Sequence, residues 1–233
     1  MKDEKTDWMP NINWYYREEN VAIACGDCLE VMKKIPDKSI DLILTDPPYG
    51  VKRDKGFGGF GGFGGFGRPI ARRQYNDCWD ENRPNKIYFD EILRISKKAL
   101  IFGGNYFADI LPQSRHWIVW EKLNTMPTFG DCELIWTNIK RNSVKKITYQ
   151  YNGLLGKEKE RYHPTQKPVK LIKLILNNYS SENDIILDPF LGSGTTAVAC
   201  KDLGRKCIGI EISEEYVKIA IKRLSQEVLK FDE

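Results

Sequence analysis

The sequence predicts an α/β fold with a single doubly wound sheet, in which buried strands alternate with helices. Residues 21–44 have the pattern of a strand, a short helix and a second strand, which is typical of a βαβ unit. Two apolar runs, residues 40–45 and 184–187, indicate buried strands, and each is followed at once by a proline-containing motif. Because ligands bind at the carboxyl ends of strands in open α/β sheets, we expect both motifs to line a site.

Strands are expected where short apolar runs stand between turn residues. These runs are residues 21–24, 40–44, 99–102, 117–120, 133–136, 185–187 and 207–210. Pro36 and Asp37 form the expected turn between the first helix and the second strand.

Helices are expected where apolar residues recur at helical spacing, as Leu171 and Ile175 do, or where start and stop signals occur. Gly204 is a typical residue at which a helix stops. The predicted helices span residues 29–34, 89–98, 169–179 and 195–203, and a last amphipathic helix begins at about Ser213.

The length indicates one domain, which we expect to span residues 1–233. The chain carries 36 basic and 32 acidic residues, a net charge of +4, so a nucleic-acid surface would have to be local. No apolar stretch is long enough to span a membrane, and the charged N-terminus lacks the apolar core of a signal peptide. These features predict a cytoplasmic protein.

One pair of the six cysteines, Cys25 and Cys28, has the C-x-x-C spacing of zinc and redox sites. A structural zinc site normally needs a second pair of ligands, and the sequence has no such pair. We therefore interpret Cys25 and Cys28 as small residues at a strand-to-helix turn, and we expect no metal site.

Residues 56–67 repeat Gly-Gly-Phe, which cannot form a packed element because its backbone entropy is high and its side chains are few. We therefore expect residues 51–75 to be a flexible insertion. It is either a neutral surface loop or a mobile lid over the substrate, since it begins just after the first motif. As part of a lid, Arg68, Arg72 and Arg73 would contact phosphates.

A second unusual segment, residues 138–161, is polar and basic with interleaved tyrosines. It is either a solvated face or a surface that contacts the phosphate backbone of a nucleic acid. It lies within residues 121–162, the candidate target-recognition region. The candidate contact residues are Lys140, Arg141, Lys145 and Lys146.

The second motif, residues 188–196, has the features of a nucleoside-binding turn. Gly192 and Gly194 leave room where the backbone must approach a ligand. Glu211 ends the next predicted strand, where an acid can accept hydrogen bonds from ribose hydroxyls. Dehydrogenases also have a glycine turn followed by an acid at the end of the next strand. However, this sequence lacks the third glycine of the dehydrogenase pattern, and Pro189 favours a wide, rigid turn. A phosphate-binding P-loop is excluded because no Gly-Lys-Ser/Thr follows.

Residues 188–196 (Asp-Pro-Phe-Leu-Gly-Ser-Gly-Thr-Thr) and residues 46–49 (Asp-Pro-Pro-Tyr) together resemble the motifs of the β-class amino-methylating DNA methyltransferases, which use S-adenosylmethionine. Residues 163–168 (His-Pro-Thr-Gln-Lys-Pro) resemble the family element that touches the methionine end of the cofactor. Residues 26–27 resemble the element that contacts its adenine edge. The catalytic motif precedes the cofactor motif, so the resemblance implies a Rossmann-like methyltransferase sheet with circularly permuted motif order.

The resemblance also implies which residues form each site. The implied cofactor-binding residues are Asp27, His163, Thr165, Gln166, Lys167, Asp188, Pro189, Phe190, Gly192, Ser193, Gly194, Thr195, Thr196 and Glu211. The implied catalytic residues are Asp46, Pro47, Pro48 and Tyr49.

The catalytic motif suits a base with an exocyclic amine, which is a poor nucleophile because its lone pair is delocalised into the ring. Two acceptors, the carboxylate of Asp46 and the backbone carbonyl of Pro47, would free that lone pair, and Pro48 stiffens the turn. Tyr49 offers a ring on which the base can stack. Direct displacement of this kind needs no metal and no covalent nucleophile.

The resemblance implies methyl transfer to the N6 amine of adenine in double-stranded DNA, on a base flipped out of the duplex. Adenine is favoured because Asp-Pro-Pro-Tyr occurs mostly in the adenine enzymes of this family. The alternatives are cytosine-N4 methylation, RNA methylation and a non-catalytic DNA-binding module. A homodimer is expected, and a restriction endonuclease is a candidate partner.

Overall fold

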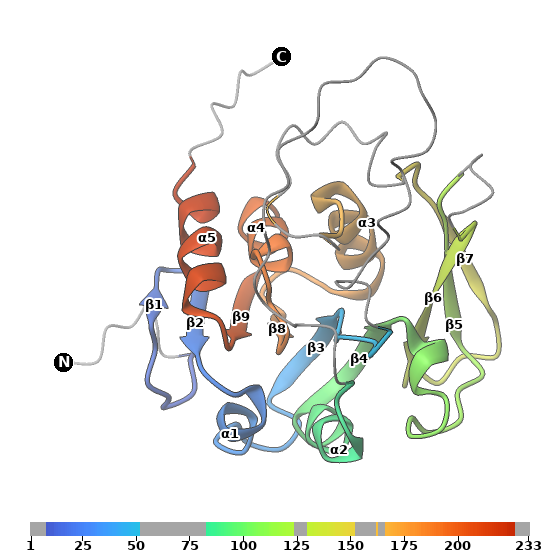
Figure 1. Ribbon diagram of the computed structural model, residues 1–233, viewed down its shortest axis with the longest axis horizontal. Coiled ribbons are helices and arrows are strands. Elements are labelled where there is room, and N and C mark those ends of the chain that lie inside the picture. The colour runs from blue at the N-terminus through green and yellow to red at the C-terminus, as the bar shows by residue number, and fades with distance from the viewer. Residues whose placement is uncertain (1–7, 52–82, 124–129, 152–161, 163–165, 227–233) are drawn as a thin grey trace.

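The computed structural model of the protein describes residues 8–51, 83–123, 130–151, 162 and 166–226. Within these residues the strands form one nine-stranded sheet in the order β1-β2-β9-β8-β3-β4-β6-β5-β7 (Figure 1). Strands β2, β9, β8, β3 and β4 run parallel, whereas β1 and β6 run antiparallel to β2 and β4. The strands are β1 (Tyr16–Arg17), β2 (Val21–Cys25), β3 (Ile40–Thr45), β4 (Ser96–Phe102), β5 (Trp117–Glu121), β6 (Cys132–Thr137), β7 (Lys145–Thr148), β8 (Ile185–Asp188) and β9 (Lys206–Glu211).

Helices cover both faces of this sheet. In Figure 1, α1 and α2 lie on one face, and α3, α4 and α5 lie on the other. This arrangement confirms the predicted doubly wound α/β fold. The helices are α1 (Cys28–Met32), α2 (Lys86–Ile95), the 3-10 helix η3 (Gly104–Phe107), α3 (Val169–Tyr179), α4 (Thr195–Asp202) and α5 (Glu214–Leu224).

Two hydrophobic clusters fill the space between the sheet and its helices. Leu171 and Ile175 of α3 belong to one cluster together with Leu44 of β3. Phe89 of α2 belongs to the other together with Ile43 of β3. Successive side chains of a strand point to opposite faces, so β3 is buried on both sides, which explains its continuous apolar run.

The central strands bring the two motifs to one edge of the sheet. β3 lies beside β8, and Thr45 Oγ1 at the end of β3 donates a 2.7 Å hydrogen bond to Asp188 Oδ1 at the end of β8. From β3 the chain crosses to β4 on one side, whereas from β8 it crosses to β9 on the other. The border between β3 and β8 is therefore the topological switch point, where ligands bind in folds of this kind.

Two helices begin near this edge on capping side chains. Asp27 Oδ1 accepts a 2.7 Å hydrogen bond from the backbone N–H of Leu29 at the start of α1. Asn85 Oδ1 accepts a 3.1 Å hydrogen bond from the backbone N–H of Ile87 at the start of α2. Such caps satisfy backbone donors that have no partner within the helix, so they fix where each helix starts.

The observed element boundaries depart from the prediction in one clear place. α3 spans the predicted residues 169–179, but the helix predicted to reach residue 98 ends at Ile95, and β4 begins at Ser96. Ser96 is extended, with φ −103° and ψ 148°, and it pairs with Ile40 of β3. Pairing with a central strand therefore overrides the helical pattern.

The sequence does not predict β1, η3 or β7. β7 is polar and pairs with β5 at the end of the strand order, and a polar edge strand produces no apolar run. Apart from Val51, the insertion expected at residues 51–75 lies outside the described residues. Among the helices that the structure describes, none has the length and apolar character needed to cross a membrane.

Candidate active site

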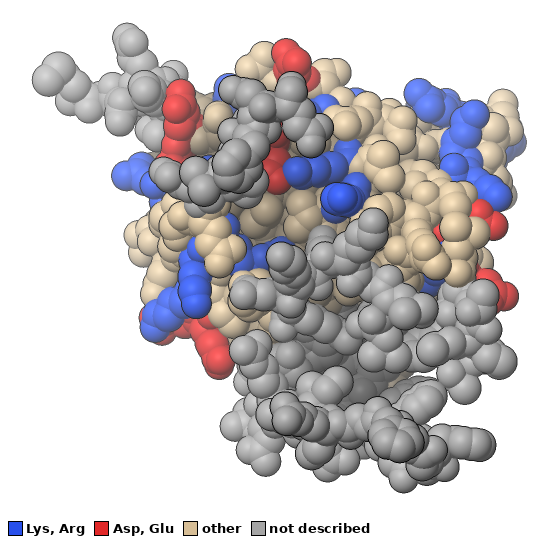
Figure 2. All heavy atoms as spheres, turned by 90° about the horizontal axis from the view of Figure 1, so that it is seen from above, with Lys and Arg blue, Asp and Glu red and all other residues tan. Residues whose placement is uncertain are grey.

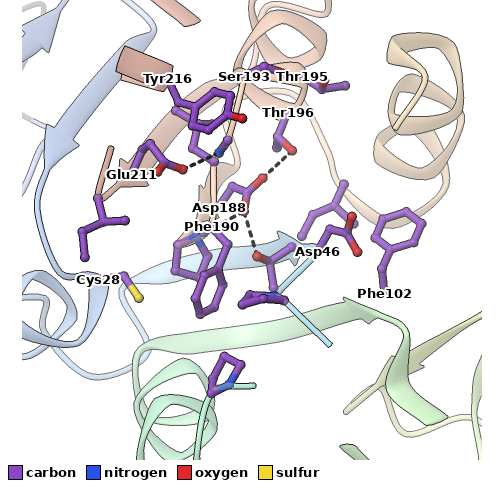
Figure 3. Close-up of a pocket in the computed structure, with 18 of the residues that line it drawn as sticks. Cys28, Asp46, Phe102, Asp188, Phe190, Ser193, Thr195, Thr196, Glu211 and Tyr216 are labelled. Atoms are coloured by element: carbon purple, nitrogen blue, oxygen red, sulfur yellow. Dashed lines mark hydrogen bonds between the residues drawn. The ribbon is translucent and has the colours of Figure 1, made fainter. Parts of the chain in front are cut away.

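A cavity of about 430 Å³ lies at the switch point, at the ends of β2, β9, β8 and β3 (Figure 3). This volume is within the range of small-molecule sites. The sequence-predicted residues that line it are Asp27, Asp46, Pro48, Gln166, Lys167, Asp188, Pro189, Phe190, Gly192, Ser193, Thr195, Thr196 and Glu211. Pro47, Tyr49 and Gly194 lie next to lining residues in the chain, and His163 and Thr165 lie outside the described residues. The structure thus brings the two motifs around one cavity.

The buried carboxylate of Asp188 joins the two motifs. Oδ1 accepts hydrogen bonds from Thr45 Oγ1 at 2.7 Å and from the backbone N–H of Phe190 at 3.1 Å. Oδ2 accepts one from Thr196 Oγ1 at 2.7 Å (Figure 3). Burial outweighs these donors and raises the pKa of Asp188 to about 6. The side chain thus organises the turn, and its predicted contact with the cofactor stays a prediction.

Asp188 is expected to make stability depend on pH. Its folded-state pKa of about 6 exceeds its ordinary value of 3.8, so the folded protein binds this proton more tightly than the unfolded chain does. The resulting stabilisation is complete below the ordinary pKa and is lost as the pH rises to about 6, by up to roughly 3 kcal/mol. Urea unfolding of the wild type and of Asp188→Asn across this pH range measures it. Parallel pH dependences for the two proteins would contradict the expectation.

The glycine turn between β8 and α4 is held by two charged side chains. Glu211 Oε2 accepts a 2.8 Å hydrogen bond from the backbone N–H of Gly192, and its Oε1 accepts one from Ser213 at 2.9 Å. From α5, Arg223 Nη1 donates to the backbone carbonyl of Ser193 at 2.7 Å. Each oxygen of a carboxylate can accept more than one hydrogen bond, so a ribose contact by Glu211 is compatible with its bonds to the turn and stays a prediction.

The surroundings of this turn fit a nucleoside. Gly192 has φ +54°, and among the described residues no atom other than those of its chain neighbours lies within 4 Å of the position that a Cβ would take, so this backbone has room for a ligand. The rings of Tyr88 and Phe190 lie 6.3 Å apart between centroids, and both line the cavity. Tyr88 Oη also donates a 3.5 Å hydrogen bond to Asp27 Oδ2. Aromatic faces, carboxylates and an open glycine backbone are the features that bind a base and a ribose.

Asp46 follows β3, and the protein holds its carboxylate at both oxygens. Tyr49 Oη donates to Oδ1 and Lys167 Nζ donates to Oδ2, each at 2.5 Å. Burial raises the pKa of Asp46, as does the nearby Glu133 carboxylate, although Lys167 and Tyr49 act in the opposite direction. The resemblance places Lys167 with the cofactor, whereas the structure bonds its ammonium to the catalytic motif.

The ring of Tyr49 lies in an aromatic group next to the carboxylate of Asp46. It stacks on Tyr106, with centroids 4.6 Å apart and an interplanar angle of 15°, and contacts the edge of Phe107 at 6.1 Å. A Cβ at Gly103, where φ is +64°, would lie 2.3 Å from Tyr49 Cε1. The close approach of this ring therefore requires glycine at position 103.

Several residues of the site are not identified from the sequence. Tyr88, Phe102 and Tyr216 line the cavity but belong to no recognised motif. Tyr106 stacks on Tyr49, and Glu133 Oε2 lies 3.4 Å from Lys167 Nζ. Of these residues, only Glu133 could have been found from the sequence. It is a charged residue at the start of an apolar strand run, and such a residue is a candidate for a buried ion pair.

The cysteine pair occupies the predicted strand-to-helix turn, since Cys25 ends β2 and Cys28 begins α1. Burial, with a smaller contribution from the Asp27 carboxylate, raises the pKa of the Cys28 thiol to about 12, so it stays protonated at neutral pH. In the described part of the chain, no group of three or more His, Cys, Asp or Glu side chains is placed to hold a metal ion.

The predicted nucleic-acid residues that the structure describes are exposed around β7. They are Lys140, Arg141, Lys145 and Lys146. Lys and Arg side chains gather on the right in Figure 2, the side of the molecule on which β7 lies in Figure 1. Lys146 pairs with Glu121 at 3.0 Å. Arg68, Arg72 and Arg73 lie outside the described residues, so their DNA contacts stay predictions.

Comparison with known proteins gives one family match and several curated relatives. Residues 72–222 match the family described as DNA methylase. The chain is 30% identical over 248 residues to the type II methyltransferase M.HinfI of Haemophilus influenzae, an alignment that covers 88% of this chain and 68% of the relative. It is 31% identical over 255 residues to the type II methyltransferase M2.LlaDCHI of Lactococcus lactis subsp. cremoris, which covers 91% and 92%.

Solved structures share the fold. The cytosine-N4-specific PvuII DNA methyltransferase matches with a TM-score of 0.66 at 18% identity, over 96% of this chain and 92% of that protein. The M1.HpyAVI–SAM complex matches with a TM-score of 0.55 at 26% identity, over 88% and 99%. The family match covers more than half of this chain and the curated relatives align over most of it, so the chain belongs to the DNA methylase family of amino methyltransferases.

Proposed function

We propose that this DNA methylase transfers the methyl group of S-adenosylmethionine to the exocyclic N6 amine of adenine in double-stranded DNA. The observation that carries the proposal is that the Asp46 carboxylate and the glycine turn at Gly192 line one cavity at the switch point. A cofactor on the turn and a base at Asp46 would therefore meet within that cavity.

The cofactor would lie along the ends of β2, β8 and β9. Tyr88 and Phe190 offer ring faces to its adenine, and Glu211 offers acceptors to its ribose hydroxyls. When bound, the cofactor supplies an activated methyl group: the amine nitrogen bonds to the methyl carbon while the carbon–sulfur bond breaks and leaves its electrons on sulfur.

Asp46 and Pro47 would act on the target amine. The carboxylate of Asp46 accepts one amine hydrogen and the backbone carbonyl of Pro47 accepts the other, which turns the nitrogen lone pair out of the ring. Lys167 and Tyr49 already fix both carboxylate oxygens, so little reorganisation is needed. After transfer the nitrogen holds an extra proton, and Asp46 is a base in position to take it, with a pKa that burial raises.

DNA would approach the side of the molecule that carries the basic residues around β7. Lys140 and Lys145 are exposed there and would contact phosphates, within the proposed recognition region of residues 121–162. A base within a duplex must be flipped out to reach the cavity. The type II names of the relatives support a restriction-modification setting, in which an endonuclease is the candidate partner. The proposal also includes a homodimeric enzyme. Light scattering with and without DNA tests the dimer, and a monomer in both conditions would exclude it.

The base can be identified by methylome sequencing and nucleoside mass spectrometry of DNA from cells that express this chain. We expect N6-methyladenine within one sequence context and none in cells that express an Asp46 variant. N4-methylcytosine instead would keep the enzyme class and overturn the choice of base. Unmodified DNA with methylated RNA would change the substrate, and no methylation of either would favour a non-catalytic DNA-binding module.

A further inference from the structure

Four side chains of alternating charge form a connected network that includes Asp46. Lys167 Nζ lies 2.5 Å from Asp46 Oδ2 and 3.4 Å from Glu133 Oε2. Lys122 Nζ lies 2.6 Å from Glu133 Oε1. Asp46 follows β3, Lys167 precedes α3, Glu133 lies in β6 and Lys122 follows β5, so the network joins four separate parts of the chain. We call these four residues the charged network.

The charged network is far less exposed than an ordinary surface ion pair. The side chains of Lys167 and Glu133 are 10% and 20% exposed, whereas those of Lys86 and Asp90 on α2 are 63% and 53% exposed. Charges withdrawn from water are costly unless each has a partner of opposite sign. Removal of one charge from the network should therefore change the pKa values of the neighbouring groups.

Lys167 depends on both of its acidic neighbours. Burial disfavours the charged amine, but the carboxylates of Asp46 and Glu133 overcome this effect and raise the pKa of Lys167. The ammonium also lies 5.0 Å from the ring centroid of Phe102 and 5.9 Å from that of Tyr49. The lysine is thus held as a cation between two carboxylates and two aromatic rings.

Glu133 has an unequal environment at its two oxygens. Its Oε1 pairs with Lys122, but its Oε2 is buried and forms no hydrogen bond within the described part of the protein. The ammonium of Lys167 lies 3.4 Å from Oε2 and is its counter-ion. A buried carboxylate oxygen without a hydrogen bond is costly unless an opposite charge lies near it. Lys167 supplies that charge, so the Glu133 carboxylate and the Lys167 ammonium are coupled to each other.

We propose that Glu133 is a positioning residue for methyl transfer, which holds Lys167 on Asp46 Oδ2 and so fixes the catalytic carboxylate. The inference rests on the proposed function and deepens it, because Glu133 acts through Lys167 without touching the base. The negative charge of Glu133 also partly offsets the electrostatic effect of the Lys167 ammonium on the Asp46 carboxylate. Asp46 is then both fixed in place and a stronger acceptor for the amine.

Kinetics of Glu133→Gln test the first consequence. The substitution keeps the shape of the side chain and removes its charge. We expect kcat to fall roughly tenfold or more while KM for DNA changes by less than about twofold, since the basic residues proposed to contact phosphates are unaltered. Glu91→Gln is the matched control, because Glu91 is 19% exposed, pairs with Arg94 at 2.7 Å on α2 and does not line the cavity.

An NMR titration of the Asp46 carboxyl in the cofactor-free protein tests the second consequence. The groups that act on Asp46 are Lys167, Tyr49 and Glu133, and Asp188 lies close enough to interact with its charge. Because the Glu133 charge raises the pKa of Asp46, Glu133→Gln should lower the pH at which Asp46 titrates. Glu133→Asp keeps the charge and should leave this titration nearer to that of the wild type.

The outcomes separate this inference from the proposed function. A loss of kcat together with a lowered Asp46 titration in Glu133→Gln, and neither change in Glu91→Gln, supports it. Unchanged turnover, or lost turnover with an unshifted Asp46 titration, overturns it. If the wild type methylates no nucleic acid, the proposed function fails, and an unshifted titration would still overturn the coupling of Glu133 to Asp46. If Glu133→Gln does not fold, the same titration in Glu133→Met, which also removes the charge, decides, and an Asp46 pKa unchanged in that variant overturns the inference.

Discussion

Asp46→Asn should lower methyl transfer by roughly a thousandfold, because the amide replaces the anionic acceptor of the target amine and cannot take its proton. Affinity for S-adenosylmethionine should stay within about threefold of the wild type, since the glycine turn is held by Glu211 and Arg223. Single-turnover kinetics with excess enzyme measure the first quantity and calorimetry measures the second. Near-wild-type turnover would show that Asp46 is not the acceptor.

A matched control for Asp46→Asn is available on the exposed surface of α2. Asp90 also pairs with a lysine, Lys86, at 2.5 Å, but both side chains are more than half exposed. Asp90→Asn makes the same chemical change without reaching the cavity. We expect wild-type kinetics, because exposed ion pairs contribute little to stability and neither residue of this pair lines the cavity.

A set of three glycine variants should separate packing from ligand access. At Gly194 φ is +85° and an added Cβ would lie 2.6 Å from Ala220 Cβ, so Gly194→Ala combines backbone strain with overpacking of α4 against α5. We expect it to lose roughly 2–4 kcal/mol of stability. At Gly204 φ is +66° and the Cβ position is open, so Gly204→Ala should cost only about 1 kcal/mol.

Gly192→Ala should behave differently from both. Its φ of +54° and open Cβ position predict a small loss of stability, as at Gly204, but Gly192 lines the cavity. Cofactor affinity should therefore fall by roughly tenfold or more, because the methyl group occupies space over the turn. Chemical denaturation and calorimetry on all three variants measure the two effects. Equal cofactor affinity in Gly192→Ala and Gly204→Ala would place the cofactor elsewhere.

The parts of the fold that follow from local patterns could be predicted from the sequence. Helical spacing defines α3, and apolar runs identify β3 and β8. The motif at each strand end then predicts a site at one edge of the sheet, and Asp46 and Gly192 do line one cavity. These features can be predicted because the apolar pattern of a strand and the residues of a turn lie within a short stretch of the sequence.

Contacts between distant segments could not be predicted. Lys167 belongs to a segment that resembles a cofactor element, yet its ammonium bonds to Asp46, 121 positions earlier in the chain. Glu133 sits in a predicted strand, but only the packing of β6 beside β4 brings it to Lys167. The end of α2 at Ile95 likewise depends on the pairing of β4 with β3. Such features arise from tertiary structure, which periodicity does not encode.

The order of strands in the sheet also determines when the protein can fold during its synthesis. Val21 of β2 pairs with Cys207 of β9, and Leu42 of β3 pairs with Ile186 of β8. The interior strands made first on the ribosome therefore wait for partners made much later, which is the high contact order that slows folding. Until β8 and β9 emerge, β2 and β3 expose apolar edges that chaperones can bind and that favour aggregation. A nascent chain stalled before β8 would lack both the completed sheet and any methyltransferase activity.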